Sequence, residues 1–417
     1  MFSKWHWMIL QLSRRLWVRA VLYALLAVVT VLSTIFFREL IPADLAGKIG
    51  AEAVDKILGI LASGMLVVTT FSLSVMVAAF SSATSSISPR ATRLLMEDSI
   101  TQNVLGTFVG SFLFSLIGII ALNTGVYDNE GRVILFIVTL CVTVIIVATI
   151  LIWIEHLSHL GRVSETSDKV EKAALAAVLQ RAEHPWLGGL PLDSIQIPQD
   201  AKPVYSQEIG YIEHLDMKAV SQWADKTGSR VYINTLPGAF VHPKRVLAWI
   251  ETTAESGADT VESAFSIARE RSFDQDPRFG LSVLTEIASR ALSPAVNDPG
   301  TAIEIIGRGV RLLFQWQTCE PNLEAAGKVE YPRLYIPSVT PAELFDDFFV
   351  PIARDGATMI EVQIRLQKAL HALAQRGGAF HDNAKRHSDD ALRRAEASLV
   401  FEGDKERLRT LVTDLFH

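Results

Sequence analysis

The chain has 417 residues, of which 49% are hydrophobic and 20% are charged, and its formal net charge at pH 7 is −6. Its mean hydropathy of +0.28 is high for a soluble protein of this length. The net negative charge argues against nucleic-acid binding, which requires a basic face. Two cysteines are too few for a disulfide framework, so the composition does not indicate an oxidising compartment.

The apolar residues gather in the first part of the chain. Residues 1–159 contain 10 basic and 9 acidic residues, whereas residues 160–417 contain 29 and 36, a net charge of −7. This division predicts a membrane region followed by a charged region in water. The N-terminus does not have the form of a cleavable signal, because no small-residue cleavage site follows the first apolar run.

Residues 1–19 mix tryptophans with basic residues, as in Trp5, Trp7, Trp17 and Arg14. This composition is typical of a helix that lies at the membrane interface. A plain helical lead-in to the first span explains it equally well.

Four apolar stretches follow, each close to the ~20 residues that a helix needs to cross a bilayer. Together they predict a four-helix transmembrane domain over residues 20–160. The expected spans are residues 20–37, 57–80, 104–124 and 133–154, with the second helix continuing to Ser86.

Basic residues indicate the orientation of the spans. They are more frequent before the first span, between the second and third, and after the fourth than in the other connections. This bias predicts a multi-pass protein of the bacterial inner membrane with both termini in the cytoplasm. The outward loop, residues 38–56, is interpreted as an ordinary solvated loop; the alternative is that its acidic side chains concentrate cations. These side chains are Glu39, Asp44, Glu52 and Asp55.

The second span contains more hydroxyl groups than a lipid-facing helix requires. On a helix, Thr70, Ser74, Ser81, Ser85 and Ser88 fall on one face, because they are 4, 7, 4 and 3 residues apart. A hydroxylated stripe on an apolar helix indicates contact with another helix or with water.

Two interpretations of this stripe stay open. In the first, one such helix from each subunit of a homo-oligomer lines a pore, Gly64 allows close approach at the outer end, and Phe71 or Phe80 forms an apolar constriction. In the second, the hydroxyls bond neighbouring backbones inside a single four-span bundle, which is too small to enclose water. The candidate pore-lining residues are Gly64, Thr70, Phe71, Ser74, Phe80, Ser81, Ser85 and Ser88.

The fourth span ends with Glu155, His156 and His159. Two histidines three residues apart on a helix are weak candidates for metal ligands. We favour a polar cluster at a helix end, because no third ligand is apparent.

The charged region divides into three parts. Residues 161–203 predict a helical extension and a linker rich in Pro and Gly. Residues 204–252 predict a small β-rich module, with one helix capped by Asp216 and a type II turn at Pro237-Gly238. Residues 253–417 predict a mainly helical domain, so the fold class is a membrane protein with an α+β cytoplasmic domain.

Several helix starts in the last part carry clear capping signals. Asp276-Pro277 and Asp298-Pro299 each place an N-cap acceptor before a proline, which predicts helices over 277–291 and from Pro299 to about Trp316. Thr340 to Glu343 form a predicted capping box. Residues 357–376 form a predicted amphipathic helix.

Polar residues cluster around the first two of these helix starts. One interpretation is a Ca²⁺ or Mg²⁺ site built from oxygens of Asp274, Asp276, Asn297 and Asp298. The favoured alternative is a structural network of helix caps and ion pairs. The candidate network or ligand site comprises Arg271, Asp274, Asp276, Arg278, Arg290, Asn297 and Asp298.

Two blocks of the sequence resemble a known family. The first runs from Phe71-Ser72-Leu73-Ser74-Val75 through Ser88-Pro89-Arg90 to Gly106-Thr107-Phe108, and the second from Asp276-Pro277-Arg278-Phe279 through Ala295-Val296-Asn297-Asp298-Pro299. Both are similar to a bacterial family of predicted inner-membrane proteins classed as a domain of unknown function. The resemblance implies four membrane spans and a C-terminal soluble domain, but no activity.

The chain contains no phosphate-binding glycine loop, nucleophile elbow or zinc-protease motif. We therefore expect a protein that is not an enzyme and needs no cofactor. The favoured function is a homo-oligomeric ion channel, conducting cations in preference to anions and assembled or gated by its cytoplasmic domain. Its partners would be membrane lipid, inorganic ions and further copies of itself. The alternative is a non-conducting, membrane-anchored sensor or scaffold whose cytoplasmic domain binds a ligand or partner.

Overall fold

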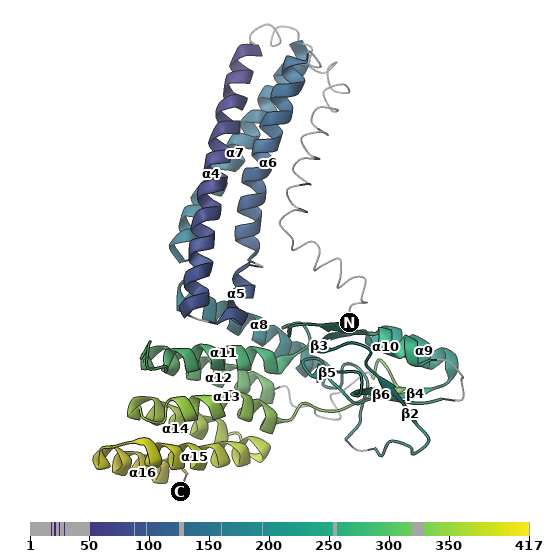
Figure 1. Ribbon diagram of the computed structural model, residues 1–417, viewed down its shortest axis with the longest axis vertical. Coiled ribbons are helices and arrows are strands. Elements are labelled where there is room, and N and C mark those ends of the chain that lie inside the picture. Colours follow the sequence, from purple (N-terminus) through teal and green to yellow (C-terminus); the bar gives the residue numbers. More distant parts are fainter. Residues whose placement is uncertain are drawn as a thin grey trace. The chain divides into compact units, whose positions relative to one another are not determined.

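The computed structural model describes residues 51–86, 88–96, 98–124, 129–159, 161–193, 195–252, 257–318 and 329–416, and in addition residues 18, 21, 25 and 29. The described residues fall into two compact units, whose elements are labelled in Figure 1. The membrane unit takes its residues from 8–85 and 92–165. The C-terminal unit takes its residues from 86–91 and from 166 onward.

Among the described residues, three helices are long and apolar enough to cross a bilayer: α4 (Ala51–Ser86), α6 (Ser99–Asn123) and α7 (Asn129–His159). They coincide with the predicted second, third and fourth spans. A short helix, α5 (Pro89–Met96), lies between α4 and α6. The predicted first span and interfacial helix lie outside the described residues, apart from four helical positions, so the count of four spans stays a prediction.

Helix α4 begins six residues before the predicted start of the second span. Its first turn contains Glu52, an acidic residue that suits the positive end of the helix dipole. The Lys56 ammonium lies 3.2 Å from the Glu52 carboxylate, one turn away. Glu52 and Asp55 are therefore part of a helix and not of the predicted loop.

Helices α6 and α7 pack on one side of α4 through two apolar clusters. In one cluster Leu58 of α4 contacts Phe114 and Leu135. In the other, Met65 of α4 contacts Phe108 and Trp153. Buried apolar side chains that recur every three or four residues give α4 one packed face.

The β-rich module contains two small sheets. The five-stranded sheet has the order β1-β8-β4-β6-β2, and the three-stranded sheet has the order β5-β3-β7. The strands of the first are Leu190–Pro191, Leu334–Ile336, Arg230–Ile233, Val246–Glu251 and Lys202–Tyr205, and those of the second are Phe240–Val241, Gly210–Leu215 and Phe265–Ala268.

The module is less local in sequence than predicted. Strand β8 pairs in parallel with both β1 and β4, although it follows β4 by about a hundred residues. Strand β7 also lies beyond residue 252. The predicted boundaries of 204 and 252 are therefore too narrow for this module.

The predicted local signals within the module are confirmed. Helix α9 (Met217–Thr227) begins at Asp216, whose Oδ1 accepts a hydrogen bond from the Ala219 N–H at 3.0 Å. In the turn, the Ala239 N–H donates to the Leu236 carbonyl at 3.2 Å, and Gly238 has a φ of +93°. That φ fits the third position of a type II turn, which favours glycine. A further short helix, α10, spans Ala258–Ser263.

The remaining helices of the C-terminal unit are α8 (Val163–Glu183), α11 (Pro277–Ala291), α12 (Pro299–Thr318), α13 (Pro341–Asp355), α14 (Ile360–Ala374), α15 (Gly378–Ser398) and α16 (Glu402–Phe416). From α11 onward they stack in two layers, with α11, α13 and α15 in one and α12, α14 and α16 in the other (Figure 1). Fully buried Phe345, Phe348, Phe349 and Phe380 fill the space between them.

The capping signals of the sequence position these helices as predicted. Helix α11 has the predicted bounds, and Asp276 accepts from the backbone N–H groups of Arg278 and Phe279. Thr340 and Glu343 form the predicted capping box of α13. Each start follows from a side-chain acceptor followed by proline at the first helical position.

Candidate functional site

Helix α4 has a packed face that contains one buried hydroxyl group. The Trp153 indole Nε1–H donates to Ser72 Oγ at 2.9 Å, and Ser72 is fully buried. Val54, Leu58 and Met65 share this face, because they precede Ser72 by 18, 14 and 7 residues. Ser72 therefore marks the side of α4 that meets α6 and α7. The sequence interpretation missed it, although Trp and Ser are a natural hydrogen-bonding pair between membrane helices.

The predicted hydroxyl stripe lies on the opposite side of α4. Each residue turns the helix by about 100°, so Thr70 and Ser74, each two residues from Ser72, point about 200° away from it. Ser81 is nine residues from Ser72, or about two and a half turns, and so points about 180° away from it. All three side chains are exposed. The hydroxyl stripe is thus separate from the face that holds the described helices together.

The spacing of this exposed face is regular. Ser63, Val67, Thr70, Ser74, Val77 and Ser81 follow one another at intervals of 4, 3, 4, 3 and 4 residues, and all are exposed. We name these six residues the open face of α4. This heptad spacing is that of helices that pack side by side around a common axis. Ser63 was not among the predicted residues, although it precedes Thr70 by one heptad.

Three hydroxyl donors of the open face, those of Ser63, Thr70 and Ser74, are used within the helix. Thr70 Oγ1–H donates to the Leu66 carbonyl and Ser74 Oγ–H to the Thr70 carbonyl, both at 2.9 Å. Ser63 donates in the same way to the Gly59 carbonyl at 2.9 Å. With the donor used, each hydroxyl oxygen presents acceptor lone pairs outward.

The other predicted lining residues are placed as follows. Phe71 is 64% exposed and Phe80 is half-buried, and they lie on opposite flanks of the open face. Gly64 is half-buried, and a Cβ built there would meet no atom within 4 Å. Ser85 belongs to α4, but its side chain lies outside the described residues.

Ser88 does not belong to the stripe. Helix α4 ends at Ser86, and Ser88 is almost fully buried, with its hydroxyl donating to Glu286 Oε2 at 2.7 Å. The predicted periodicity assumed one continuous helix, whereas Pro89 starts a new helix at this point. Ser88 is therefore not a lining residue.

One of the two predicted metal candidates, His156, belongs to a hydrogen-bonded cluster at the ends of two helices. His156 Nε2 lies 3.0 Å from Asp98 Oδ2 and 3.1 Å from Thr101 Oγ1, and its ring stacks on Trp153. Asp98 also caps α6 by accepting from the Thr101 N–H. His159 is the last residue of α7, and its side chain lies outside the described residues. In the described part of the chain, no three His, Cys, Asp or Glu residues are grouped to hold a metal ion.

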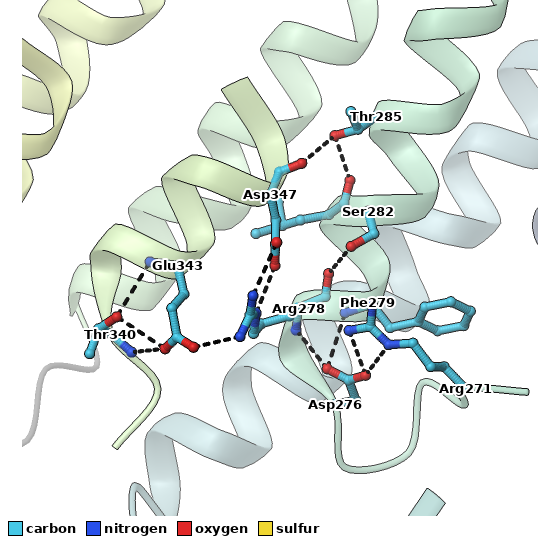
Figure 2. Close-up of polar contacts among 10 residues, drawn as sticks. Arg271, Asp276, Arg278, Phe279, Ser282, Thr285, Thr340, Glu343 and Asp347 are labelled. Atoms are coloured by element: carbon cyan, nitrogen blue, oxygen red, sulfur yellow. Dashed lines mark hydrogen bonds and ion pairs between the residues drawn. The ribbon is translucent and has the colours of Figure 1, made fainter. Parts of the chain in front are cut away.

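The polar block around α11 centres on Asp276 (Figure 2). Its carboxylate accepts from Arg271 Nε and Nη2, both at 2.8 Å, and from the backbone N–H of Arg278 at 3.1 Å and of Phe279 at 3.2 Å. A Cβ on Gly238 would overlap this carboxylate, so the type II turn packs directly against it. Asp276 thus ties α11 to the β-rich module.

Arg278 extends the network to α13. Its guanidinium donates from Nε to Asp347 Oδ2 at 2.7 Å and from Nη2 to Oδ1 at 3.1 Å. Nη1 donates to Glu343 Oε1 at 2.5 Å, and Glu343 is also the acidic member of the capping box of α13 (Figure 2). Such a bidentate pair fixes both distance and orientation.

The structure does not bring the four predicted acidic and amide oxygens together. Asp276 precedes α11 and Asp298 follows it, so this 15-residue helix separates them by roughly 22 Å. Asp298 instead accepts from Thr301 N at 3.1 Å and from Thr301 Oγ1 at 2.5 Å. Asn297 adopts a φ of +50° in the preceding turn. A single cation site with Asp274, Asp276, Asn297 and Asp298 is therefore wrong.

The last two predicted residues have local roles. Arg290 lies in the final turn of α11, where its carbonyl accepts from the Ser293 N–H and hydroxyl. The Asp274 N–H lies 3.4 Å from Ser272 Oγ. Both are contacts within the protein, as the structural network favoured from the sequence would make.

Sequence analysis missed the buried cation of this network, Arg181 of α8. Its Nη2 donates to the Gln275 carbonyl at 3.0 Å, and its side chain is almost fully buried. Burial lowers the pKa of Arg181 to about 10, and the charge of Asp276 opposes that shift. Burial in turn raises the pKa of the Asp276 carboxyl, and Arg271 opposes the rise. Only the position of an arginine among alanines on α8 hinted at this role.

Comparison with known proteins gives a family but no activity. The chain is similar to the uncharacterized proteins Rv1290c of Mycobacterium tuberculosis and Mb1321c of Mycobacterium bovis, with 28% identity over 247 residues in each case. The match covers 57% of this chain and 47% of each relative, so the chain spans about half the length of the curated relatives it matches. No solved structure is significantly similar.

The family comparison agrees with the sequence resemblance. The model of the DUF2254 family, described as a predicted membrane protein, matches residues 13–372 and so covers most of the chain, including both sequence blocks that carry the resemblance. The chain therefore belongs to the DUF2254 family of predicted membrane proteins.

Proposed function

We propose that this protein is a subunit of a homo-oligomeric membrane pore that conducts ions and is lined by the open face of α4. The observation that supports the proposal most strongly is the position of the hydroxyl stripe. The helices α6 and α7 pack on the side of α4 that contains Ser72, whereas Thr70, Ser74 and Ser81 are exposed on the opposite side. A stripe that served only as a seam inside this bundle would be expected on the packed side.

The composition of the open face suits close contact between copies of α4. Ser and Thr are small enough to let membrane helices approach, and the heptad spacing extends over nearly three heptads, from Ser63 to Ser81. In the most apolar stretch of each helix, only 11% of α4 is buried, against 61% of α6. Among the described residues, most of α4 is therefore left uncovered, so that a neighbouring subunit, water or lipid could contact it.

The hydrogen bonding of the open face favours cations over anions. Because Ser63, Thr70 and Ser74 donate to their own helix, their oxygens are left to accept. Rings of such oxygens would replace part of the hydration shell of a cation while holding it weakly enough to leave. Exposed Phe71, beside the face, would supply an apolar constriction.

The remaining parts of the proposal concern assembly and orientation. The C-terminal unit would assemble or gate the pore from the cytoplasm. Both termini would lie there, as the distribution of basic residues predicts for a bacterial inner-membrane protein.

Crosslinking between copies tests the arrangement. In a background with Cys141→Ala and Cys319→Ala, the variant Ser74→Cys is expected to form disulfide-linked dimers in membranes on mild oxidation. The control Ser72→Cys lies on the packed face and should form none. Equal crosslinking of the two variants would contradict the arrangement. A protein that crosslinks as expected yet never conducts in liposomes would support the membrane-anchored sensor or scaffold instead.

A further inference from the structure

Two segments far apart in the sequence meet at one carboxylate. Glu286 of α11 accepts from Ser88 Oγ at 2.7 Å through Oε2, and its Oε1 forms an ion pair with Arg90 Nη1. The Arg90 N–H also donates to Ser88 Oγ at 3.2 Å. We name Ser88, Arg90 and Glu286 the clamp.

The clamp lies within the C-terminal unit. Residues 86–91 belong to this unit, together with α11. Ser88 is 2% exposed and Ala91 is fully buried, so the segment is anchored and not merely adjacent. The Arg90 and Glu286 side chains are 59% and 33% exposed, so their ion pair alone is expected to contribute little. The hydrogen bond from the buried Ser88 hydroxyl to the charged Glu286 carboxylate fixes the position of Ser88 on α11.

The clamp is connected to α4 by the chain itself. Ser88 follows the last residue of α4, Ser86, by two residues. Pro89 then fixes the start of α5. The end of α4 and the clamp are therefore separated by a single residue of the chain, through which a movement of the clamp can reach α4.

Glu286 is itself held on a rigid element. Asp276 ties the start of α11 to the β-rich module, and Arg278 ties the next turn to Asp347 of α13. A displacement of the helical stack would thus be carried to Glu286 by a helix fixed at its N-terminal end.

We infer that Glu286 is a positioning residue of the proposed pore, and that the clamp couples the C-terminal unit to the end of α4. This inference rests on the proposed function, and it gives that function a mechanism of regulation. In this chain, one of the two sequence blocks that carry the family resemblance contains Ser88 and Arg90, and the other encloses Glu286.

The first test asks whether the clamp exists in the membrane-embedded protein. In the background without native cysteines, Ser88→Cys with Glu286→Cys should be joined within one chain by a short bifunctional thiol reagent, detected by mass spectrometry of the intact protein. Ser88→Cys paired with Glu396→Cys of α15 is the control and should not react. Failure of the first pair to react would overturn the inference whether or not the protein conducts.

The second test asks whether the clamp regulates. Glu286→Ala removes the acceptor of the Ser88 hydroxyl and should change ion flux from liposomes about tenfold, the effect of losing one hydrogen bond to a charged group. Glu286→Gln keeps an amide oxygen that can accept from the Ser88 hydroxyl and should retain most of the wild-type flux, a rescue by the conservative variant that a general loss of folding would not show. Glu396→Gln removes a separate ion pair with Arg409 and should leave flux unchanged.

The outcomes separate the inference from the function on which it rests. Flux from the wild type with no response to Glu286→Ala would overturn the inference alone. No flux from the wild type would overturn the proposed pore, and the regulatory role of the clamp with it.

Discussion

Asp276 and Asp298 show how the same sequence signal can serve two environments. Each is an aspartate before a proline at the start of a helix, and each accepts backbone hydrogen bonds there. Asp276 is buried and also pairs with Arg271, whereas the Asp298 contacts are exposed. The local sequence predicts the caps but cannot show burial, which comes from the Gly238 turn and from α8.

Replacing each aspartate by alanine should therefore give unequal losses of stability. Asp276→Ala removes a cap and leaves buried cations without their counterion, which should lower the free energy of unfolding by about 3 kcal/mol. Asp298→Ala removes an exposed cap, which costs about 1 kcal/mol. Urea unfolding of the purified full chain, followed by tryptophan fluorescence, measures both. Equal losses would show that the Asp276 network adds nothing beyond capping.

His387 provides a prediction of pH dependence. Burial lowers the pKa of His387 below its ordinary value of 6.5, and the neighbouring Arg386 lowers it further, while Asp346 opposes both. Because the folded pKa lies below the unfolded one, the unfolded state binds more protons as the pH falls through 6.5. The stability of the C-terminal unit should fall there, and His387→Gln should flatten that part of the curve. An unchanged slope in unfolding midpoints between pH 7.5 and pH 5 would contradict this.

At the scale of elements, the predictions from sequence succeed where the signal is local. The bounds of α11 follow from Asp276-Pro277 at one end and Ser293-Pro294 after the other. Strand β8 was not predicted to join the module, because its three residues pair in parallel with strands that precede it by about a hundred residues or more. The hydroxyl periodicity of α4 was visible in sequence, whereas the side on which α6 and α7 pack depends on tertiary contacts such as that of Ser72 with Trp153.

Two glycines test the close packing of helices in the C-terminal unit. A Cβ at Gly280 of α11 would overlap Ala174 of α8, including its backbone, so Gly280→Ala should destabilise the protein by about 2 kcal/mol. A Cβ at Gly307 of α12 would meet only Arg365 Nη2, at 3.5 Å, so Gly307→Ala should stabilise by about 0.5–1 kcal/mol through helix propensity. Unfolding midpoints measure both changes. Effects of the same sign would contradict the packing of α8 on α11.

At the scale of the whole molecule, the division into an apolar and a charged part was predictable from composition. Three described helices are long and apolar enough to cross a membrane, and the family is one of predicted membrane proteins. A sequence cannot show how many copies assemble, because the same Ser and Thr stripe suits a seam or a pore. The position of Ser72 opposite the stripe shows which side of α4 the described helices α6 and α7 occupy, and the proposed pore is argued from that observation.

The most direct measurement is block of ion flux by a charged thiol reagent. Ser63→Cys, Ser74→Cys and Ser81→Cys would be compared, in liposomes and in the background without native cysteines, with Thr149→Cys. Thr149 is the matched control, because its hydroxyl also donates to its own helix, to the Ile145 carbonyl at 2.7 Å, but it lies on α7. We predict that modification abolishes most of the flux in the three α4 variants and leaves that of Thr149→Cys unchanged. Flux that persists after complete modification of Ser74→Cys would contradict a pore lined by α4.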